Sequence, residues 1–235
     1  MMLPDIPAYI TVIFIATVVL TWWLLLMATK NKTLGFVSIA WLLLTGILAY
    51  KGFYLDTNSV PPKFVFAVAP VVLIILLLFA SPAGRRFIDG LDLRLLTLIS
   101  IVRIPVELVL YWLSQHKAIP ELMTFTGRNF DILAGISALI VYYACFKGNK
   151  VTNRSALLVW NIISLGLLLN VVINAVFSAP FRFQQFGFDQ PNIAVLYFPF
   201  TWLPSFIVMT VLFSHLVSIR KLAMTKGKQD ILQKI

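Results

Sequence analysis

The sequence has 235 residues, of which 60% are hydrophobic and 12% are charged. Its mean hydropathy is +0.93, whereas a soluble domain is roughly half apolar and a quarter charged. This composition excludes a soluble fold and predicts an integral membrane protein with one helical domain. The formal net charge of +10 lies mostly at the ends of apolar segments. We therefore expect a lipid bilayer as the partner and no nucleic acid.

Seven apolar segments follow one another along the chain, each close to the roughly 20 residues that cross a bilayer as a helix. We expect spans at 8–29, 34–51, 62–81, 93–114, 130–146, 155–178 and 194–218. Unbroken apolar runs favour helices over barrel strands, in which polar and apolar residues alternate. We therefore predict an all-α fold, with a seven-transmembrane-helix bundle over residues 1–219 and a basic tail at 220–235.

Lysine and arginine are divided unequally between the two sets of connecting loops. Most of the 19 residues of these two types fall at 30–33, 82–94, 147–154 and 220–235. Because cytoplasmic loops carry the excess of Lys and Arg, we expect the N-terminus outside and the C-terminus in the cytoplasm. The opening stretch MMLPDIPAY has no basic residue, unlike a signal peptide. We expect its apolar continuation to be retained, in a bacterial cytoplasmic membrane.

Three polar residues share one face of the fourth predicted span. Arg103, Glu107 and Tyr111 follow one another at intervals of four, which stacks them along a helix. A charge at the bilayer centre costs about 2.5–3.5 kcal/mol on insertion scales. Pro105 removes a backbone donor between the two charges and predicts a kink. Partners from other helices, from water or from a ligand are therefore expected.

Other spans and loops place polar and aromatic residues at the same depth or further out. These are Arg128, Asn129, Asp131, Asn170, Asn174, Arg182, Tyr197 and Trp202. Together with the three residues of the fourth span, we predict that they form a polar ligand pocket, open to the outside and closed toward the cytoplasm. The five phenylalanines at 177–188 suggest a lid or an interfacial anchor. Two alternatives stay open: an ion pair that only fixes helix register, and asparagines that only hold helices together.

The histidines predict no metal site. His116 and His215 fall at opposite ends of the bundle, and the sequence has no HExxH motif and no Cys–His cluster. We expect no cofactor. The span count and orientation resemble those of rhodopsins in topology alone. Retinal requires a lysine in the last helix for its Schiff base, and no lysine occurs between Lys150 and Lys221.

Three functions are compatible with this pattern. The first is a binding or sensing protein for a small amphiphilic or anionic ligand, such as a lipid, whose anionic group Arg103 and Arg128 would hold. The second is a membrane enzyme with Glu107 or Asp131 as acid or base, acting on a lipophilic substrate. The third is an ion-coupled transporter in which Glu107 titrates. The scarcity of polar residues in the inner half favours the first.

Overall fold

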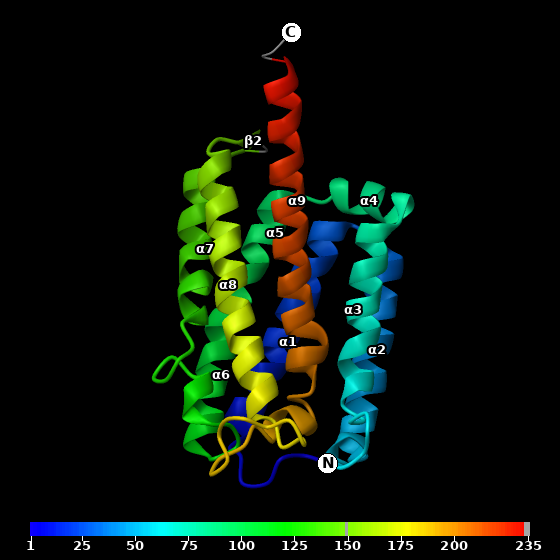
Figure 1. The fold of residues 1–235 in the computed structure, drawn as a ribbon, viewed down its shortest axis with the longest axis vertical. Coiled ribbons are helices and arrows are strands. Elements are labelled where there is room, and N and C mark those ends of the chain that lie inside the picture. The colour runs from blue at the N-terminus through cyan, green and yellow to red at the C-terminus, as the bar shows by residue number, and fades with distance from the viewer. Residues whose placement is uncertain (149, 233–235) are drawn as a thin grey trace.

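The computed structural model describes residues 1–148 and 150–232, with the side chains of the C-terminal helix included up to residue 224. Helices run along the long axis of the molecule, and the two termini lie at opposite ends (Figure 1). The longer helices are α1 (Ala8–Thr29), α2 (Lys32–Tyr50), α3 (Val65–Ala80), α6 (Arg103–Gln115), α7 (Asp131–Cys145), α8 (Arg154–Ser178) and α9 (Val208–Leu232).

Short elements connect these helices. They are α4 (Pro82–Asp89), α5 (Leu93–Ile99), the 3-10 turns η1 (Phe53–Leu55), η2 (Ser100–Val102), η3 (Glu121–Met123) and η4 (Ala194–Leu196), and the π-helical turn η5 (Leu203–Ile207). Strands β1 (Phe146–Lys147) and β2 (Lys150–Val151) pair antiparallel, with Phe146 opposite Val151. Helices dominate, as the sequence predicts.

Among the residues that the structure describes, four helices are long and apolar enough to cross a membrane: Ala8–Thr29, Lys32–Tyr50, Arg154–Ser178 and Leu203–Met224. Helices α3 and α4 pass the same test as a pair, bent by 91° at their junction, which makes a fifth candidate. Helix α7 is apolar but shorter. The described part of the chain is therefore mostly helical, with four or five candidate membrane-spanning helices.

The fourth predicted range is filled by three consecutive helical pieces, α5, η2 and α6. The 3-10 turn ends just before Pro105, whose missing N–H leaves the Ile101 carbonyl without its usual α-helical donor. The predicted distortion therefore takes the form of a tightened turn on the N-terminal side of the proline.

The last predicted range needs correction at both ends. Residues 194–202 form a 3-10 turn and irregular chain, and the helical run begins only at Leu203. It then continues without a break to Leu232, so residues 220–232 of the expected basic tail are helical. The side chains of residues 225–235 lie outside those that the structure describes.

Helix α4 lies across the end of the bundle, nearly perpendicular to α3 (Figure 1). Ser81 is extended and its hydroxyl accepts a hydrogen bond from the Gly84 N–H at 3.0 Å, while Pro82 fills the first helical position. Both features start a new helix at this point. Ile88 is buried, whereas Arg86 is exposed, so α4 has the amphipathic character of a helix at a membrane surface.

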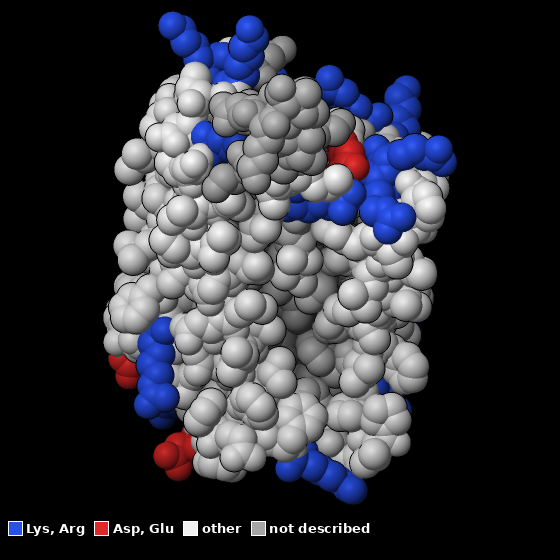
Figure 2. Space-filling view, turned by 45° about the horizontal axis from the view of Figure 1, so that its top comes forward, with Lys and Arg blue, Asp and Glu red and all other residues white. Residues whose placement is uncertain are grey.

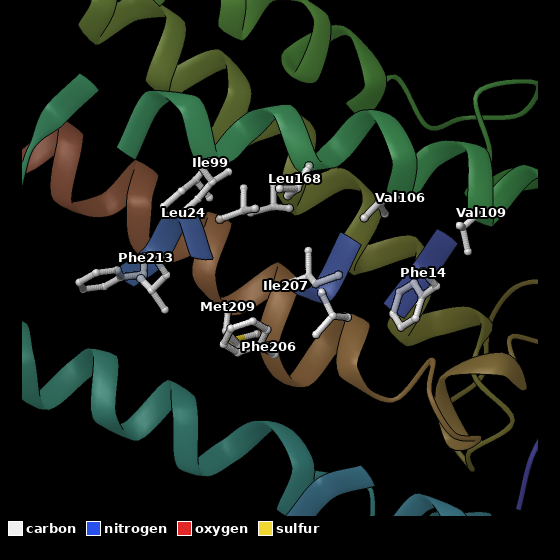
Figure 3. Packing of buried hydrophobic residues seen from close by; sticks show 14 of the residues in the cluster. Phe14, Leu24, Ile99, Val106, Val109, Leu168, Phe206, Ile207, Met209 and Phe213 are labelled. Atoms are coloured by element: carbon white, nitrogen blue, oxygen red, sulfur yellow. The ribbon is translucent and has the colours of Figure 1, made fainter. Parts of the chain in front are cut away.

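The main core is built where α1, α5, α6, α8, η5 and α9 meet. Figure 3 shows apolar side chains from all these elements gathered between them, among them Phe14, Ile99, Val106, Leu168 and Ile207. Helix α3 is less closely integrated, since it meets the bundle mainly through η5 and α9. This arrangement leaves room between α3 and α8.

Candidate ligand pocket and buried polar cluster

Arg103 forms a two-pronged ion pair with Asp131, the first residue of α7. Its Nε donates to Asp131 Oδ2 at 2.6 Å, and its Nη2 donates to Asp131 Oδ1. Nη2 also donates to the Ser164 carbonyl of α8 at 2.9 Å. Arg103 is 2% exposed and Asp131 is 4% exposed. A planar guanidinium matches a carboxylate in this geometry, so the pair joins α6 and α7 in the interior.

A glycine lets α6 and α7 approach closely enough for this pair. Gly135 lies one turn after Asp131, and a Cβ at this position would lie 2.8 Å from Ile104 Cγ1 and 3.1 Å from the Ile104 backbone nitrogen. Any larger residue would therefore push α7 away from the helix that carries Arg103.

His215 and Asn161 extend the cluster toward the end of the molecule where the C-terminus lies. Arg103 Nη1 lies 3.2 Å from His215 Nε2, and His215 Nδ1 lies 2.9 Å from Asn161 Oδ1. A guanidinium can only donate, so Nε2 accepts and Nδ1 carries the hydrogen that reaches Asn161. Asn161 Nδ2 donates to the Leu157 carbonyl at 2.8 Å, which fixes the orientation of its amide. His215 is therefore a neutral imidazole.

Glu107 has a different partner from the one its spacing suggests. It forms no ion pair with Arg103; instead, Asn129 Nδ2 donates to its two carboxyl oxygens at 2.7 and 2.8 Å. The same nitrogen also donates to the Met123 carbonyl at 2.9 Å, and Asn129 Oδ1 accepts from the Asp131 N–H at 2.9 Å. Glu107 and Asn129 expose none of their surface. A single amide is thus the only donor that the structure gives this buried carboxyl among the described residues.

A cavity of about 560 Å³ lies beside this cluster, bordered by α3, α6, α8, η5 and α9. Its wall is almost entirely aliphatic and aromatic. The polar residues in it are Arg103, Glu107, Asp131 and Asn192. Roughly 300–1,000 Å³ of mainly apolar cavity with a few polar groups is the usual form of a small-molecule site. The sequence predicts a polar pocket, whereas the structure has an apolar one with a few polar groups at its wall, because the polar side chains bond mainly to one another.

Aromatic rings cover one end of the cavity. Tyr54 packs on Phe64 with ring centres 5.9 Å apart, Phe64 on Phe181 at 6.0 Å, and Phe181 on Phe183 at 5.5 Å. The last three rings line the cavity. These four residues, which we call the aromatic cap, include part of the phenylalanine-rich loop that the sequence suggests as a lid. Burial raises the pKa of Tyr54 to about 12, so this phenol stays neutral.

An ion pair holds the loop that carries Phe64. Lys63 Nζ lies 2.9 Å from Asp56 Oδ2. The hydrogen bond from Lys63 is the main reason why the pKa of Asp56 is held below its usual value. Both side chains are well exposed, so this pair positions the loop without contributing much to stability.

Other predicted site residues lie away from the cavity wall. Tyr111 stacks on Phe125 with ring centres 5.0 Å apart. Asn170 Nδ2 donates to the Arg128 carbonyl and Asn174 Nδ2 to the Asn170 carbonyl, at 2.8 and 2.9 Å. The Asn170 bond joins α8 to the neighbouring loop, which is the packing role considered for the asparagines, whereas the Asn174 bond stays within α8.

The remaining three predicted residues belong to the long loop before α9 and its continuation. The Arg182 side chain is exposed and Tyr197 is half-buried. Trp202 Nε1 donates to the Leu42 carbonyl at 2.9 Å, which joins this loop to α2. Of the eleven predicted residues, the cavity wall therefore includes Arg103, Glu107 and Asp131, and Asn129 lies directly behind them.

The described residues hold no group of three or more His, Cys, Asp or Glu suited to a metal ion. The family model described as "Domain of unknown function (DUF8737)" matches residues 61–223. The chain belongs to this family. No curated protein and no solved structure matches the chain.

The region that matches DUF8737 contains the whole cavity wall, from Pro62 to Val211, and the histidine at 215. Helices α1 and α2 lie before it. The cavity and the buried polar cluster are thus features of the part of the chain that defines the family, whereas α1 adds core packing from outside that region.

Proposed function

We propose that the protein binds a small lipophilic molecule that enters its cavity from the surrounding bilayer. The observation that carries the proposal is a cavity wall that continues onto the outer surface of the helices. Leu73 and Leu76 of α3 and Val176 of α8 line the cavity, yet they are 56%, 60% and 45% exposed. An exposed apolar surface at membrane depth faces lipid tails. The cavity is therefore open sideways, between α3 and α8.

The space-filling view supports a lateral opening of the cavity in the membrane. Figure 2 shows basic residues at the two ends of the molecule, a wide belt without charges between them, and a hollow within the belt. In our proposal this belt is the membrane-embedded zone, and the hollow lies where a lipid-soluble molecule has direct access. Such a molecule needs no passage through water to reach the site.

The proposal includes seven spans, with the N-terminus outside and the C-terminus in the cytoplasm. In support, α5, η2 and α6 form one helical run and α7 is apolar, so each can complete a crossing beside the longer helices. The end of the molecule with α4 and the C-terminus carries most of the visible basic residues in Figure 2. Excess Lys and Arg is the mark of a cytoplasmic face.

Mass spectrometry of molecules that copurify with the protein tests the proposal. Ala175 lines the cavity on α8, and Ala175→Phe would fill part of it. Ala144→Phe on the exposed face of α7 adds the same ring outside the cavity. We expect a lipophilic molecule with the wild type and with Ala144→Phe, and its loss from Ala175→Phe. Identical bound molecules in all three folded proteins would contradict a ligand function for this cavity.

The buried cluster favours a second candidate, proton-coupled transport. Asn129 donates to Glu107 and accepts from the backbone N–H of Asp131. The Asp131 carboxylate in turn accepts from Arg103, whose Nη1 lies 3.2 Å from His215 Nε2. Such networks accompany proton relays in membrane proteins. Purified protein in liposomes would then carry a proton flux that Glu107→Gln abolishes. A flux absent from the wild type under a pH gradient and an imposed voltage would contradict this candidate and leave the binding function intact.

A further inference from the structure

The polar atoms at the cavity wall are not equally available to a ligand. Arg103 has five N–H groups, and four of them are used by Asp131, Ser164 and His215. Asp131 is occupied by the same guanidinium and supplies the two acceptors of that pair. An anionic group would therefore have to compete with a buried carboxylate for Arg103. This argues against the anionic ligand group that the sequence suggests for this residue.

In contrast to the donors of Arg103, the hydrogen-bond acceptors at the cavity wall have unused capacity. Glu107 has two carboxyl oxygens and one donor side chain, Asn129, whose two N–H groups also serve the Met123 carbonyl. A carboxylate has about four acceptor positions. About half of its capacity is therefore unused among the described residues, although it is fully buried.

A second unused acceptor borders the same cavity. Asn192 is 1% exposed and lines the wall, and its Oδ1 has no hydrogen-bond partner among the described residues. Its Nδ2 donates to the Ala175 carbonyl at 3.2 Å. An exchange of the two amide atoms would set oxygen against oxygen there, so Oδ1 is the atom left for a donor.

The formal charges at the cavity wall also favour a ligand that donates hydrogen bonds. The charged residues at the wall are Arg103, Asp131 and Glu107, and His215 is neutral from its hydrogen bonds. Arg103 and Asp131 cancel each other, which leaves the single negative charge of an ionised Glu107 without a cation. A buried charge is retained when it is paired.

We propose that the ligand is a lipophilic amine, whose protonated nitrogen donates to Glu107 and whose apolar body fills the aliphatic cavity. This inference rests on the proposed binding function and names the chemical class of its ligand. Glu107 borders the cavity but exposes no surface, so the ammonium must move part of the lining aside. Met123 lies on the same wall, and its unbranched side chain is the kind that adapts to such a change.

Three probes with one alkyl chain and different head groups test the inference: decylammonium, decanol and decanoate. Binding to the purified protein is measured by native mass spectrometry over a concentration series. We expect decylammonium to bind about tenfold or more tightly than decanol, because a charge-assisted hydrogen bond exceeds a neutral one. Decanoate is expected to bind most weakly of the three.

Two carboxyl variants make the comparison specific. Glu107→Gln keeps the shape of the side chain and removes its charge, so the preference for decylammonium over decanol should disappear. Glu121→Gln, at an exposed position outside the cavity wall, should behave as the wild type does. Comparing each probe between proteins cancels its partition into the detergent micelle.

The outcomes separate the two proposals. If decanoate binds as tightly as decylammonium, the proposal of an amine ligand is wrong. A site built on the exposed Arg182 would give that result. Equal binding of decylammonium and decanol to the wild type also overturns the amine ligand, and this comparison needs no variant to fold. If none of the three probes binds the wild type, the cavity does not take alkyl chains and the proposed function itself fails. The same conclusion follows if Ala175→Phe binds all three probes as tightly as the wild type does.

Discussion

The guanidinium of Arg103 pairs with Asp131 on the neighbouring helix and leaves Glu107, one turn away on its own helix, to Asn129. Proximity in the sequence would instead favour an ion pair between Arg103 and Glu107. Within one helix, Arg before Glu is the weaker order for such a pair, whereas Asp131, at the start of α7, accepts from both Nε and Nη2 of the guanidinium. This choice leaves a buried carboxyl beside the cavity without a cation.

Removing one partner of this pair should strongly destabilise the protein. Arg103→Met leaves the Asp131 carboxylate buried and unpaired, at a cost of about 3–5 kcal/mol. The double variant Arg103→Met, Asp131→Leu should recover much of that loss, because neither charge remains. Thermal or denaturant unfolding in detergent measures both. Arg220→Met removes one side of the more exposed pair with Asp89 and should cost no more than about 1 kcal/mol; equal losses at the two sites would contradict the buried ion pair.

His215 should matter to stability in a way that His116 does not. His215→Ala removes the acceptor for Arg103 Nη1 and the donor for Asn161, which costs about 1–3 kcal/mol for a buried group left unsatisfied. His215→Gln retains an acceptor and should restore part of it. His116 is exposed at the end of α6, so His116→Ala serves as the control. Unfolding curves of the three variants that coincide would mean that the hydrogen bonds of His215 contribute nothing.

The start of α5 should give the protein an acid-sensitive component of stability. Burial alone would raise the pKa of Asp92, but hydrogen bonds from the Arg94 side chain and backbone outweigh it and hold the pKa below its usual value. A lowered pKa stabilises the fold above the unfolded-state value of about 3.9, and that contribution is lost as the pH falls through the folded-state pKa.

Asp92→Ala should therefore be less stable than the wild type by about 0.5–2 kcal/mol at neutral pH, since Asp92 caps α5. The difference should narrow below about pH 4. Unfolding measured from pH 3 to 7 checks this, with Asp189→Ala in an exposed loop as a control. A difference that stays constant over the whole range would show that the ionised carboxylate plays no part.

The orientation of the helices can be tested with single cysteines. Cys145 is buried, and Cys145→Ala provides a background without thiols. In intact cells, a membrane-impermeant maleimide should label Gln185→Cys in the loop before α9. Lys147→Cys at the opposite end should react only after permeabilisation. Both positions are exposed in the structure. The reverse pattern would invert the proposed topology, and labelling of both in intact cells would reject it.

The depth in the membrane that the sequence predicts for each residue is enough to group four of the site residues. Arg103, Glu107, Asn129 and Asp131 fall at similar heights in the sequence-based topology, and the structure joins them. Their pairing was not predictable, because it depends on the rotation of α7 about its axis and on the close approach that Gly135 allows.

The sequence places His215 nearer the end of its helix than the structure does, for a related reason. A span predicted at 194–218 leaves it three residues from the inner boundary, whereas the helical run from Leu203 to Leu232 has His215 near its middle. Prolines and aromatic residues before Leu203 are apolar enough to extend a hydropathy segment, but they form turns. The sequence also does not predict the lateral opening of the cavity, because the periodicity of hydrophobic residues gives no distance between α3 and α8.

A structure determined in lipid nanodiscs, at a resolution that shows side chains, tests directly whether the cavity takes a ligand from the membrane. We expect elongated density between α3 and α8, lying along Leu76 and Leu168 and ending at Glu107. A cavity closed by α3 packed against α8, with ordered lipid elsewhere on the belt but none inside, would contradict a site that takes its ligand from the membrane.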